Sequence, residues 1–167
     1  MKHSCFVKSA MSAALLGFLA LGVTPVASAS TQTTTFNVTA GVGNVCTVQA
    51  TNLNFYTIVT TVANSATSTI TVNCTLNDVY EVGLGAGDST VETARFMKGD
   101  VTPANHLTYA LYNNPGMTVN WGQTTGGQVP GVGSGANQTL TVYGQVPTQT
   151  SPGVDNYSDT ITVTLTY

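Results

Sequence analysis

Two cysteines are the residues of this sequence whose chemistry is easiest to specify. Cys46 and Cys74 are the cysteines that remain once the N-terminal leader, described below, is set aside. An even pair of cysteines in an exported chain predicts a disulfide. Closing a loop of about 29 residues would stabilise the fold by roughly 3.5 kcal/mol in the chain-entropy model. Two free thiols or a metal pair are the alternatives, but no histidine or further cysteine lies near them in the sequence.

Groups that could serve acid–base catalysis are sparse. His106 is the only histidine outside the leader, and it opens a predicted strand, where a polar turn residue is ordinary. Two acid pairs could divide acid and base roles as glycosidase carboxylates do: Asp78 with Glu81, and Glu92 with Asp100. These acids fall in connections or on the solvent side of strands, where solvated carboxylates are the common case. The sequence has no phosphate-binding glycine loop and no metal-ligand spacing, so we expect a protein that is not an enzyme and has no cofactor.

The first 29 residues have the three parts of a secretory signal peptide. Lys2 and Lys8 give a basic start, an apolar run follows at 13–23, and Ala27-Ser28-Ala29 supplies small residues for cleavage. The apolar run is too short to span a membrane comfortably. We therefore expect three parts: a signal peptide at 1–29, an N-terminal extension at 30–43, and one folded domain at 44–167.

The charge of the mature chain excludes one class of partner. The remaining 138 residues carry two basic side chains, Arg95 and Lys98, and seven acidic ones, for a net charge of −5. A chain without a basic patch has nothing to neutralise a phosphate backbone, so nucleic acid is a poor partner. The abundant Thr, Asn, Gln and Gly residues predict a neutral, polar surface, which suits an exported protein that packs against copies of itself.

Short strands separated by polar connections are expected to position these residues. No mature segment has a sustained 3.6-residue apolar period, so helices should be absent or a single turn, and an antiparallel sandwich is expected. Residues 113–137 are rich in Gly and Asn and predict a long surface connection. The predicted strands of the domain are Cys46–Gln49, Asn52–Tyr56, Ser68–Cys74, Val79–Leu84, Thr93–Lys98, Leu107–Tyr112, Gln138–Val146 and Thr160–Tyr167.

The start of the mature chain contains a further strand pattern, at Thr33–Val42. Apolar side chains occupy every second position, which places them on one face of an extended strand. These residues are Phe36, Val38, Ala40 and Val42. A terminal strand with one apolar face must find a sheet edge, either in its own domain or in a neighbour.

The last predicted strand has the strongest alternation of all. Threonines at 160, 162, 164 and 166 alternate with larger side chains, which again defines one apolar face. The larger residues are Ile161, Val163, Leu165 and Tyr167. No residue follows in this sequence to pair the free edge of the strand, so we expect that edge to be open to a partner.

Short segments of a recognisable kind follow one another along the mature chain. They are Cys46-Thr47-Val48, Ile70–Cys74, Tyr80–Leu84, Arg95-Phe96-Met97, Leu107–Tyr112, Trp121-Gly122, Leu140–Pro147, Tyr157-Ser158-Asp159 and Ile161–Tyr167. In this order, with the paired cysteines and the terminal Tyr, residues 44–167 resemble the spore coat protein U domain. This is the subunit family of archaic (Csu-type) chaperone–usher pili.

The resemblance implies a fold and a mode of assembly. The fold would be all-β, an incomplete immunoglobulin-like antiparallel sandwich whose missing last strand leaves a hydrophobic groove. Thr33–Val42 would be the donor strand that fills the groove of the next subunit with its apolar face. The final strand would line the groove, and the Tyr167 carboxylate would anchor a chaperone. The implied partners are neighbouring pilin subunits, a periplasmic chaperone and an outer-membrane usher, and the implied product is a surface pilus that supports adhesion and biofilm formation.

Two other functions remain open at this stage. The first is a carbohydrate-binding or tip-adhesin module, in which aromatic side chains stack on sugars; Trp121, in a polar Gly-rich stretch, is its best candidate, and Tyr109, Tyr112 and Tyr143 are the others. The second is a secreted coat protein, which could assemble by the same strand exchange. A separate tip-binding domain is not expected, because the chain has a donor-like strand and only one predicted domain.

Overall fold

The computed structural model of the protein describes residues 28–150 and 152–167. The predicted signal peptide lies outside this range apart from Ser28 and Ala29. Ala40–Tyr167 form one compact unit, and its first strand begins at Cys46. The predicted boundary at residues 43 and 44 stays a prediction. No helix in the described part of the chain is long and apolar enough to cross a membrane.

The described residues form strands and connections and no helix, which confirms the predicted all-β class. The strands are β1 (Cys46–Ala50), β2 (Asn64–Cys74), β3 (Val79–Leu84), β4 (Arg95–Gly99), β5 (His106–Tyr112), β6 (Val129–Val132), β7 (Gln138–Val146), β8 (Tyr157–Ser158) and β9 (Val163–Thr166). Residues 28–45 contain no strand, so Thr33–Val42 stays a predicted strand.

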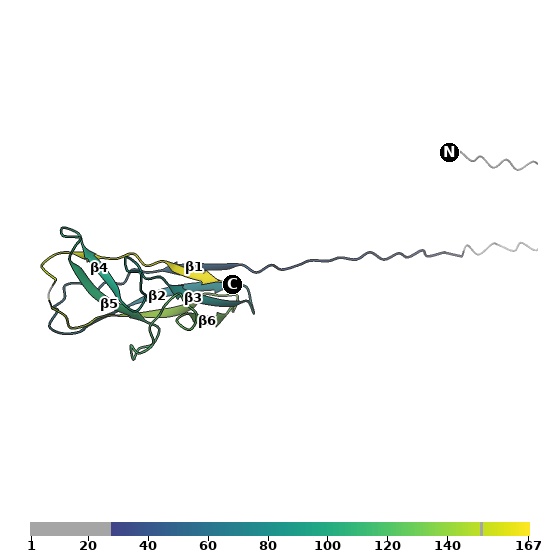
Figure 1. Ribbon diagram of the computed structural model, residues 1–167. Coiled ribbons are helices and arrows are strands. Elements are labelled where there is room, and N and C mark those ends of the chain that lie inside the picture. The colour runs from purple at the N-terminus through teal and green to yellow at the C-terminus, as the bar shows by residue number, and fades with distance from the viewer. Residues whose placement is uncertain (1–27, 151) are drawn as a thin grey trace, which may run out of the picture. The chain divides into compact units, whose positions relative to one another are not determined.

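The strands form two sheets (Figure 1). A six-stranded sheet has the order β1-β2-β7-β5-β4-β8, and a three-stranded sheet has the order β6-β3-β9. Every strand pair is antiparallel. The chain leaves the six-stranded sheet after β8 and enters the three-stranded sheet at β9, so residues 159–162 cross between the two sheets.

The core lies between the inner faces of the two sheets. Alternate residues of β2, β5 and β7 face alternate residues of β3, as a period of two requires. The buried apolar residues are Ile70, Val72, Cys74, Tyr80, Val82, Leu84, Leu107, Tyr109, Leu111, Trp121, Val142 and Val146. Complete burial stabilises a side chain of this kind by roughly 1.5–3 kcal/mol, so these residues hold the two sheets together.

A buried arginine joins the two sheets at one end of the core. Arg95, on β4, is fully buried, and its Nε donates to the carbonyl of Gly85 at 2.9 Å. Its Nη2 donates to the carbonyls of Leu84 and Trp121, both at 2.8 Å. Burial lowers the pKa of Arg95, because the guanidinium has left water. The three carbonyls replace part of its hydration and connect β4 to the end of β3.

The connection at 113–137 differs from its prediction. It contains β6, which pairs with β3, and it contains Trp121, which is 1% exposed. The Trp121 Nε1 donates to the Val82 carbonyl at 2.9 Å, so the indole has a polar partner inside the core. The prediction of a wholly solvated connection was therefore wrong. β6 was not predicted because it contains Pro130 and Gly131, and both residue types are rare within strands except at a sheet edge or where another group approaches the backbone closely.

Candidate functional site

The two sheets leave an open gap along one side of the domain. β9 pairs with β3 through one edge, and its second edge has no strand partner among the described residues. β1 pairs only with β2, so it also ends its sheet. An unpaired strand edge carries a row of free N–H and C=O groups that can pair with another chain.

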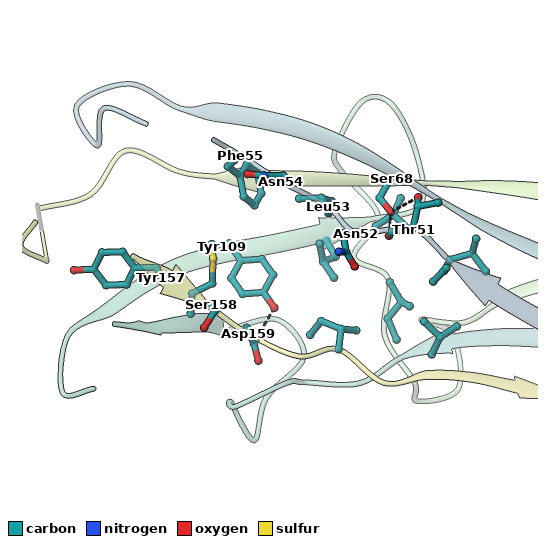
Figure 2. Close-up of a pocket in the computed structure, with 18 residues that line it drawn as sticks. Thr51, Asn52, Leu53, Asn54, Phe55, Ser68, Tyr109, Tyr157, Ser158 and Asp159 are labelled. Carbon is teal, nitrogen blue, oxygen red and sulfur yellow. Dashed lines mark hydrogen bonds between the residues drawn. The ribbon is translucent and has the colours of Figure 1, made fainter. Parts of the chain in front are cut away.

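A cleft of about 540 Å³ opens into the core at this gap. Its floor is apolar and includes Ile70, Leu84, Leu111 and Val142. In Figure 2, Leu53, Asn54 and Phe55 lie along one side, and Tyr157, Ser158 and Asp159 lie along the other. The floor residues are at most 5% exposed, so the apolar surface left open belongs to half-buried side chains along the cleft, including Leu53, Phe55, Ile161 and Val163. An ordinary sandwich would cover this surface with one more strand.

A second cleft, of about 860 Å³, continues the first. The two clefts share five lining residues, Leu53, Asn54, Phe55, Met97 and Tyr157. The second is bounded by residues 53–60 on one side and by residues 152–157 on the other. We call the two clefts together the groove. It runs from the β9 end of the gap towards the loop before β8.

One wall of the groove is an extended segment without sheet partners. Residues 52–58 continue the chain from β1, and no backbone hydrogen bond joins them to another described segment. Leu53, Phe55 and Ile58 are half-buried and pack against the core, while their neighbours are exposed. Residues 52–56 were predicted as a weak strand. Their side chains alternate between exposed and half-buried, but the segment has no neighbouring strand, in the described part of the chain, to which its backbone is hydrogen-bonded.

The other wall holds the predicted residues of the final strand. Ile161 and Val163 line the first cleft, and Leu165 is half-buried against the core. Tyr167 is 57% exposed and lies beyond β9. The regular strand is shorter than the predicted 160–167, because residues 159–162 cross between the sheets. The role of the predicted final-strand residues in binding a partner stays a prediction. These residues are Ile161, Val163, Leu165 and Tyr167.

The crossing into β9 is fixed by a single carboxylate. Asp159 accepts hydrogen bonds from the Tyr109 hydroxyl at 2.6 Å, the Asp88 N–H at 2.9 Å and the Thr160 N–H at 2.7 Å. Burial raises the pKa of Tyr109, and the hydrogen bond to Asp159 raises it further. The hydroxyl therefore stays protonated and holds β5 to the crossing. We call this pair the Tyr109–Asp159 pin.

The loop before β8 is held by another carboxylate. Asp155 accepts from the N–H groups of Val101, at 3.1 Å, and Thr102, at 2.9 Å. The N–H of Thr102 is the main cause that lowers the pKa of Asp155. Tyr157 donates its hydroxyl to the Gly153 carbonyl at 3.0 Å. These bonds shape the wall of the second cleft.

The apolar residues of the predicted donor strand are all exposed. Phe36, Val38 and Val42 each leave more than 80% of their surface open to solvent, and Ala40 is also exposed. Isolated exposed apolar residues are common, but a row of them on one face is not. Their common face on a strand and their role in strand donation stay predictions.

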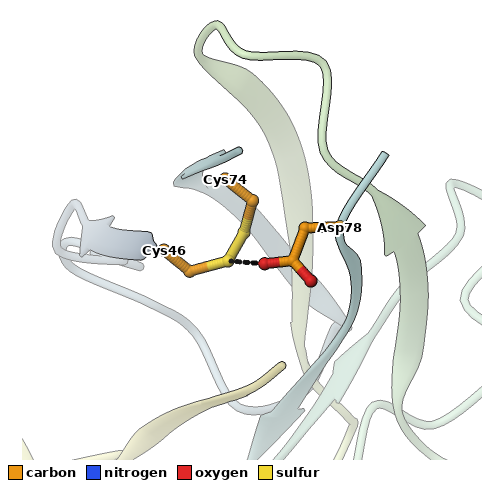
Figure 3. A group of neighbouring side chains, drawn as sticks. All are labelled: Cys46, Cys74 and Asp78. Atoms are coloured by element: carbon orange, nitrogen blue, oxygen red, sulfur yellow. Dashed lines mark hydrogen bonds between the residues drawn. A yellow bond between two sulfur atoms is a disulfide. The ribbon is translucent and has the colours of Figure 1, made fainter. Parts of the chain in front are cut away.

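The predicted disulfide is present and joins neighbouring strands. Cys46 and Cys74 face each other directly in the β1–β2 ladder and are bonded (Figure 3). A carboxylate oxygen of Asp78 lies 3.5 Å from the Cys46 sulfur. Because a disulfide sulfur has no proton to donate, this is a packing contact of a buried carboxylate. Both thiols are consumed by the bond, so the alternative of a metal held by free thiols does not apply to this state.

The catalytic candidates lie apart in ordinary structural roles. His106 stacks on Phe96 with ring centroids 4.1 Å apart. Glu92 accepts from the Gln123 N–H at 2.8 Å and so fixes a loop. Asp100 accepts from the Ser158 hydroxyl at 3.1 Å. None of these contacts pairs two of the predicted catalytic groups.

Sequence reasoning missed two contributors to the groove, the wall at 52–58 and the Tyr109–Asp159 pin. It also missed the buried Arg95, which lies outside the lining of both clefts. Alternation at Leu53 and Phe55 was the only signal for the wall. For Asp159 the signal was its place just before the strongest strand. The burial of Arg95 could not be predicted from the sequence, because an arginine is almost never fully buried without a charged partner.

Comparisons with known proteins identify the family and the fold of this chain. Protein U of Myxococcus xanthus is 31% identical over 178 residues, which cover 96% of this chain and 98% of that protein. The fold resembles a crystal structure of the CsuC–CsuE chaperone–tip adhesion subunit pre-assembly complex from archaic chaperone-usher Csu pili of Acinetobacter baumannii. That match has a TM-score of 0.57 and 21% identity and covers 75% of this chain and 40% of that chain. The Spore Coat Protein U domain matches residues 3–164, and the chain therefore belongs to the Spore Coat Protein U domain family.

Proposed function

We propose that this protein is a structural, non-enzymatic subunit of a surface pilus that polymerises by donor-strand complementation. Residues 33–42 of one copy enter the groove of the next copy and complete its sandwich. The observation that carries the proposal is the combination of an open groove lined by apolar residues and an exposed segment with alternating apolar side chains in one chain. The pilus would support adhesion and biofilm formation.

The donated strand can be satisfied on both of its edges. One edge would pair antiparallel with β9, and the other would meet the unpaired segment at 52–58. Main-chain hydrogen bonds then supply affinity, and pockets for alternate side chains supply specificity.

The groove also explains a need for a chaperone. A domain that exposes this much apolar surface beside an unpaired edge is prone to aggregate before it is assembled. We propose that a periplasmic chaperone lends a strand to the same groove and binds the Tyr167 carboxylate, and that an outer-membrane usher exchanges it for the donor strand. Support comes from the fold shared with a subunit of a chaperone–subunit complex. The disulfide agrees with folding in an oxidising, extracytoplasmic compartment.

Deletion of residues 33–42 tests the proposal. The deletion variant should fold with its chaperone but fail to form multimers that dissociate only on boiling in SDS. The matched control replaces the same ten residues with another copy of residues 33–42 from a synthetic gene, so that the cloning scars are identical. If the deletion variant still forms such multimers, the proposed mode of assembly is wrong.

A secreted coat protein is the second candidate, and one observation favours it. The identity to Protein U extends over nearly the whole of both chains. Strand exchange would be the same, so the two functions differ in the shape of the product. Electron microscopy of producing cells separates thin fibres from a continuous layer. The carbohydrate-binding alternative loses its main residue, since a Trp121 that is 1% exposed cannot stack on a sugar.

A further inference from the structure

The extension is tied to its domain immediately after its last apolar residue. The single proton of the Thr75 hydroxyl is shared between the carbonyls of Val45, at 3.3 Å, and Gly43, at 3.4 Å. The Val45 N–H donates to the same hydroxyl at 3.1 Å, and the Thr75 N–H donates to the Val45 carbonyl at 3.0 Å. No free linker therefore separates Val42 from the folded domain.

This anchoring brings two copies into contact when a strand is donated. Consecutive Cα atoms are 3.8 Å apart, so a Val42 seated in one copy's groove holds Gly43 of the donating copy at the groove exit. The turn that contains Thr75 must then lie against the accepting copy. Val45 and Leu76 flank this turn and are 63% and 64% exposed. We call these two residues the base patch.

The direction of the donated strand decides which end of the groove is the exit. All strand pairs in the domain are antiparallel, and an antiparallel neighbour of β9 would run from the Thr166 end towards residues 152–157. The exit is then the second cleft. Three exposed side chains, Tyr56, Val59 and Val154, line that cleft. We call these three residues the rim patch.

We propose that the base patch of the donating copy packs on the rim patch of the accepting copy, as a second subunit interface. This inference rests on the proposed function, because the donated strand sets the two patches opposite each other. Both patches are apolar and uncharged, so contact removes surface that would otherwise stay in water. The contact is head-to-tail, which generates an open filament and leaves one patch free at each end.

Disulfide trapping tests the contact in assembled fibres. Leu76→Cys combined with Val154→Cys should give a covalent ladder on gels that are boiled without reductant, and deletion of residues 33–42 should abolish it. The control is Leu76→Cys combined with Val119→Cys, another exposed valine, which lies outside both clefts. The control pair should form ordinary heat-dissociable fibres without the covalent ladder.

A third cysteine pair tests the direction of the strand. Leu76→Cys with Thr166→Cys should not cross-link, because Thr166 lies at the opposite end of β9 from the exit. Cross-linking of this pair in place of the Val154 pair would overturn the proposal. So would normal fibres with no cross-link in either pair, and both results would leave donor-strand assembly intact. Fibres that survive the deletion of residues 33–42 would instead refute the proposed function.

A charge substitution gives a second readout. Leu76→Asp should speed the thermal dissociation of fibres by about tenfold or more, the change expected when one leucine-sized contact is replaced by a charge. Val119→Asp is the matched control and should leave the rate unchanged. Equal dissociation rates for Leu76→Asp and the unmodified fibre would contradict the interface.

Discussion

Residues 33–42 and residues 160–167 have the same alternation of apolar and polar side chains but different surroundings. In the second segment, Val163 and Leu165 are half-buried and β9 pairs with β3. In the first, Phe36 and Val38 are exposed and no strand forms. Alternation therefore predicts which face of a strand is buried. Whether a segment pairs within its own domain depends on how its attached end is held by the domain.

The two segments are attached to the domain in different ways. The final strand is steered by the Tyr109–Asp159 pin, which fixes the crossing between the sheets just before β9 begins. The extension is fixed at its other end, by Thr75 and by the Cys46–Cys74 bond that follows. One segment is directed onto a neighbouring strand of its own domain, and the other is held only where it leaves the domain. The following predictions test this difference, from the largest expected effect to the smallest.

Val38→Asp should abolish fibre formation. A carboxylate on the apolar face would have to be buried in the groove without a partner, at a cost of several kcal/mol. Asn37→Asp is the matched control, because the neighbouring residue points to the opposite face of the strand. The measurement is the yield of heat-dissociable multimers. Equal yields from the two variants would mean that fibre formation does not depend on burial of the apolar face of residues 33–42.

Cys46→Ser should lower the stability of the domain by about 3 kcal/mol, through loss of the bond that closes β1 onto β2. Ser replaces the thiol with a group of similar size, so packing changes little. Thermal unfolding of the chaperone-free fibre and the exported yield are the measurements. An unchanged melting temperature under oxidising conditions would show that the Cys46–Cys74 bond does not stabilise the domain.

Tyr109→Phe should destabilise the domain by about 1–3 kcal/mol at neutral pH, because the half-buried Asp159 carboxylate loses one of its hydrogen-bond donors. The pKa of Tyr109 is raised in the folded state, so above pH 10 the unfolded chain loses a proton that the folded chain keeps. The stability of the unmodified protein should therefore fall above about pH 10, and that of Tyr109→Phe should fall less. Tyr157→Phe, which removes a hydroxyl that makes an exposed hydrogen bond to the Gly153 carbonyl, is the control. Parallel curves for Tyr109→Phe and the unmodified protein would argue against the pin.

Asp78→Asn should make the disulfide easier to reduce. Thiol exchange at Cys46 brings an anionic sulfur close to the Asp78 carboxylate, and like charges disfavour that step. Removal of the charge should speed reduction of the folded protein by thiols about tenfold, or about 1.4 kcal/mol in the barrier. Asp88→Asn is the control, and the difference should vanish in denaturant. A difference that persists in the unfolded chain would exclude the folded contact as its cause.

The regular strands were the predictable part of this fold. Val79–Leu84 and Gln138–Val146 were predicted at the observed bounds, because each keeps a period of two over its full length. β6 was missed, since Pro130 and Gly131 read as a turn. Residues of this kind are tolerated there because β6 is an edge strand.

The site was predictable in its strands and not in its polar contacts. The apolar faces of both key segments follow from local alternation. The Tyr109–Asp159 pin joins residues 50 positions apart, and the carbonyls bound by Arg95 come from the end of β3 and from two different connections. Such long-range contacts depend on how the sheets meet, which no local pattern encodes. The same holds for Trp121, whose Gly-rich neighbours indicated exposure although it is buried.

The bond between Cys46 and Cys74 has a mechanical consequence in the proposed fibre. Tension on the extension enters the domain at Gly43 and reaches Cys46 three residues later. β1 is an edge strand of five residues, so without the bond a pull on its first residue would be carried by the β1–β2 ladder alone. The covalent bond transfers the load to β2, an 11-residue strand paired on both sides. A pulled fibre would then load the β2–β7 ladder as well as the β1–β2 ladder before any domain opens.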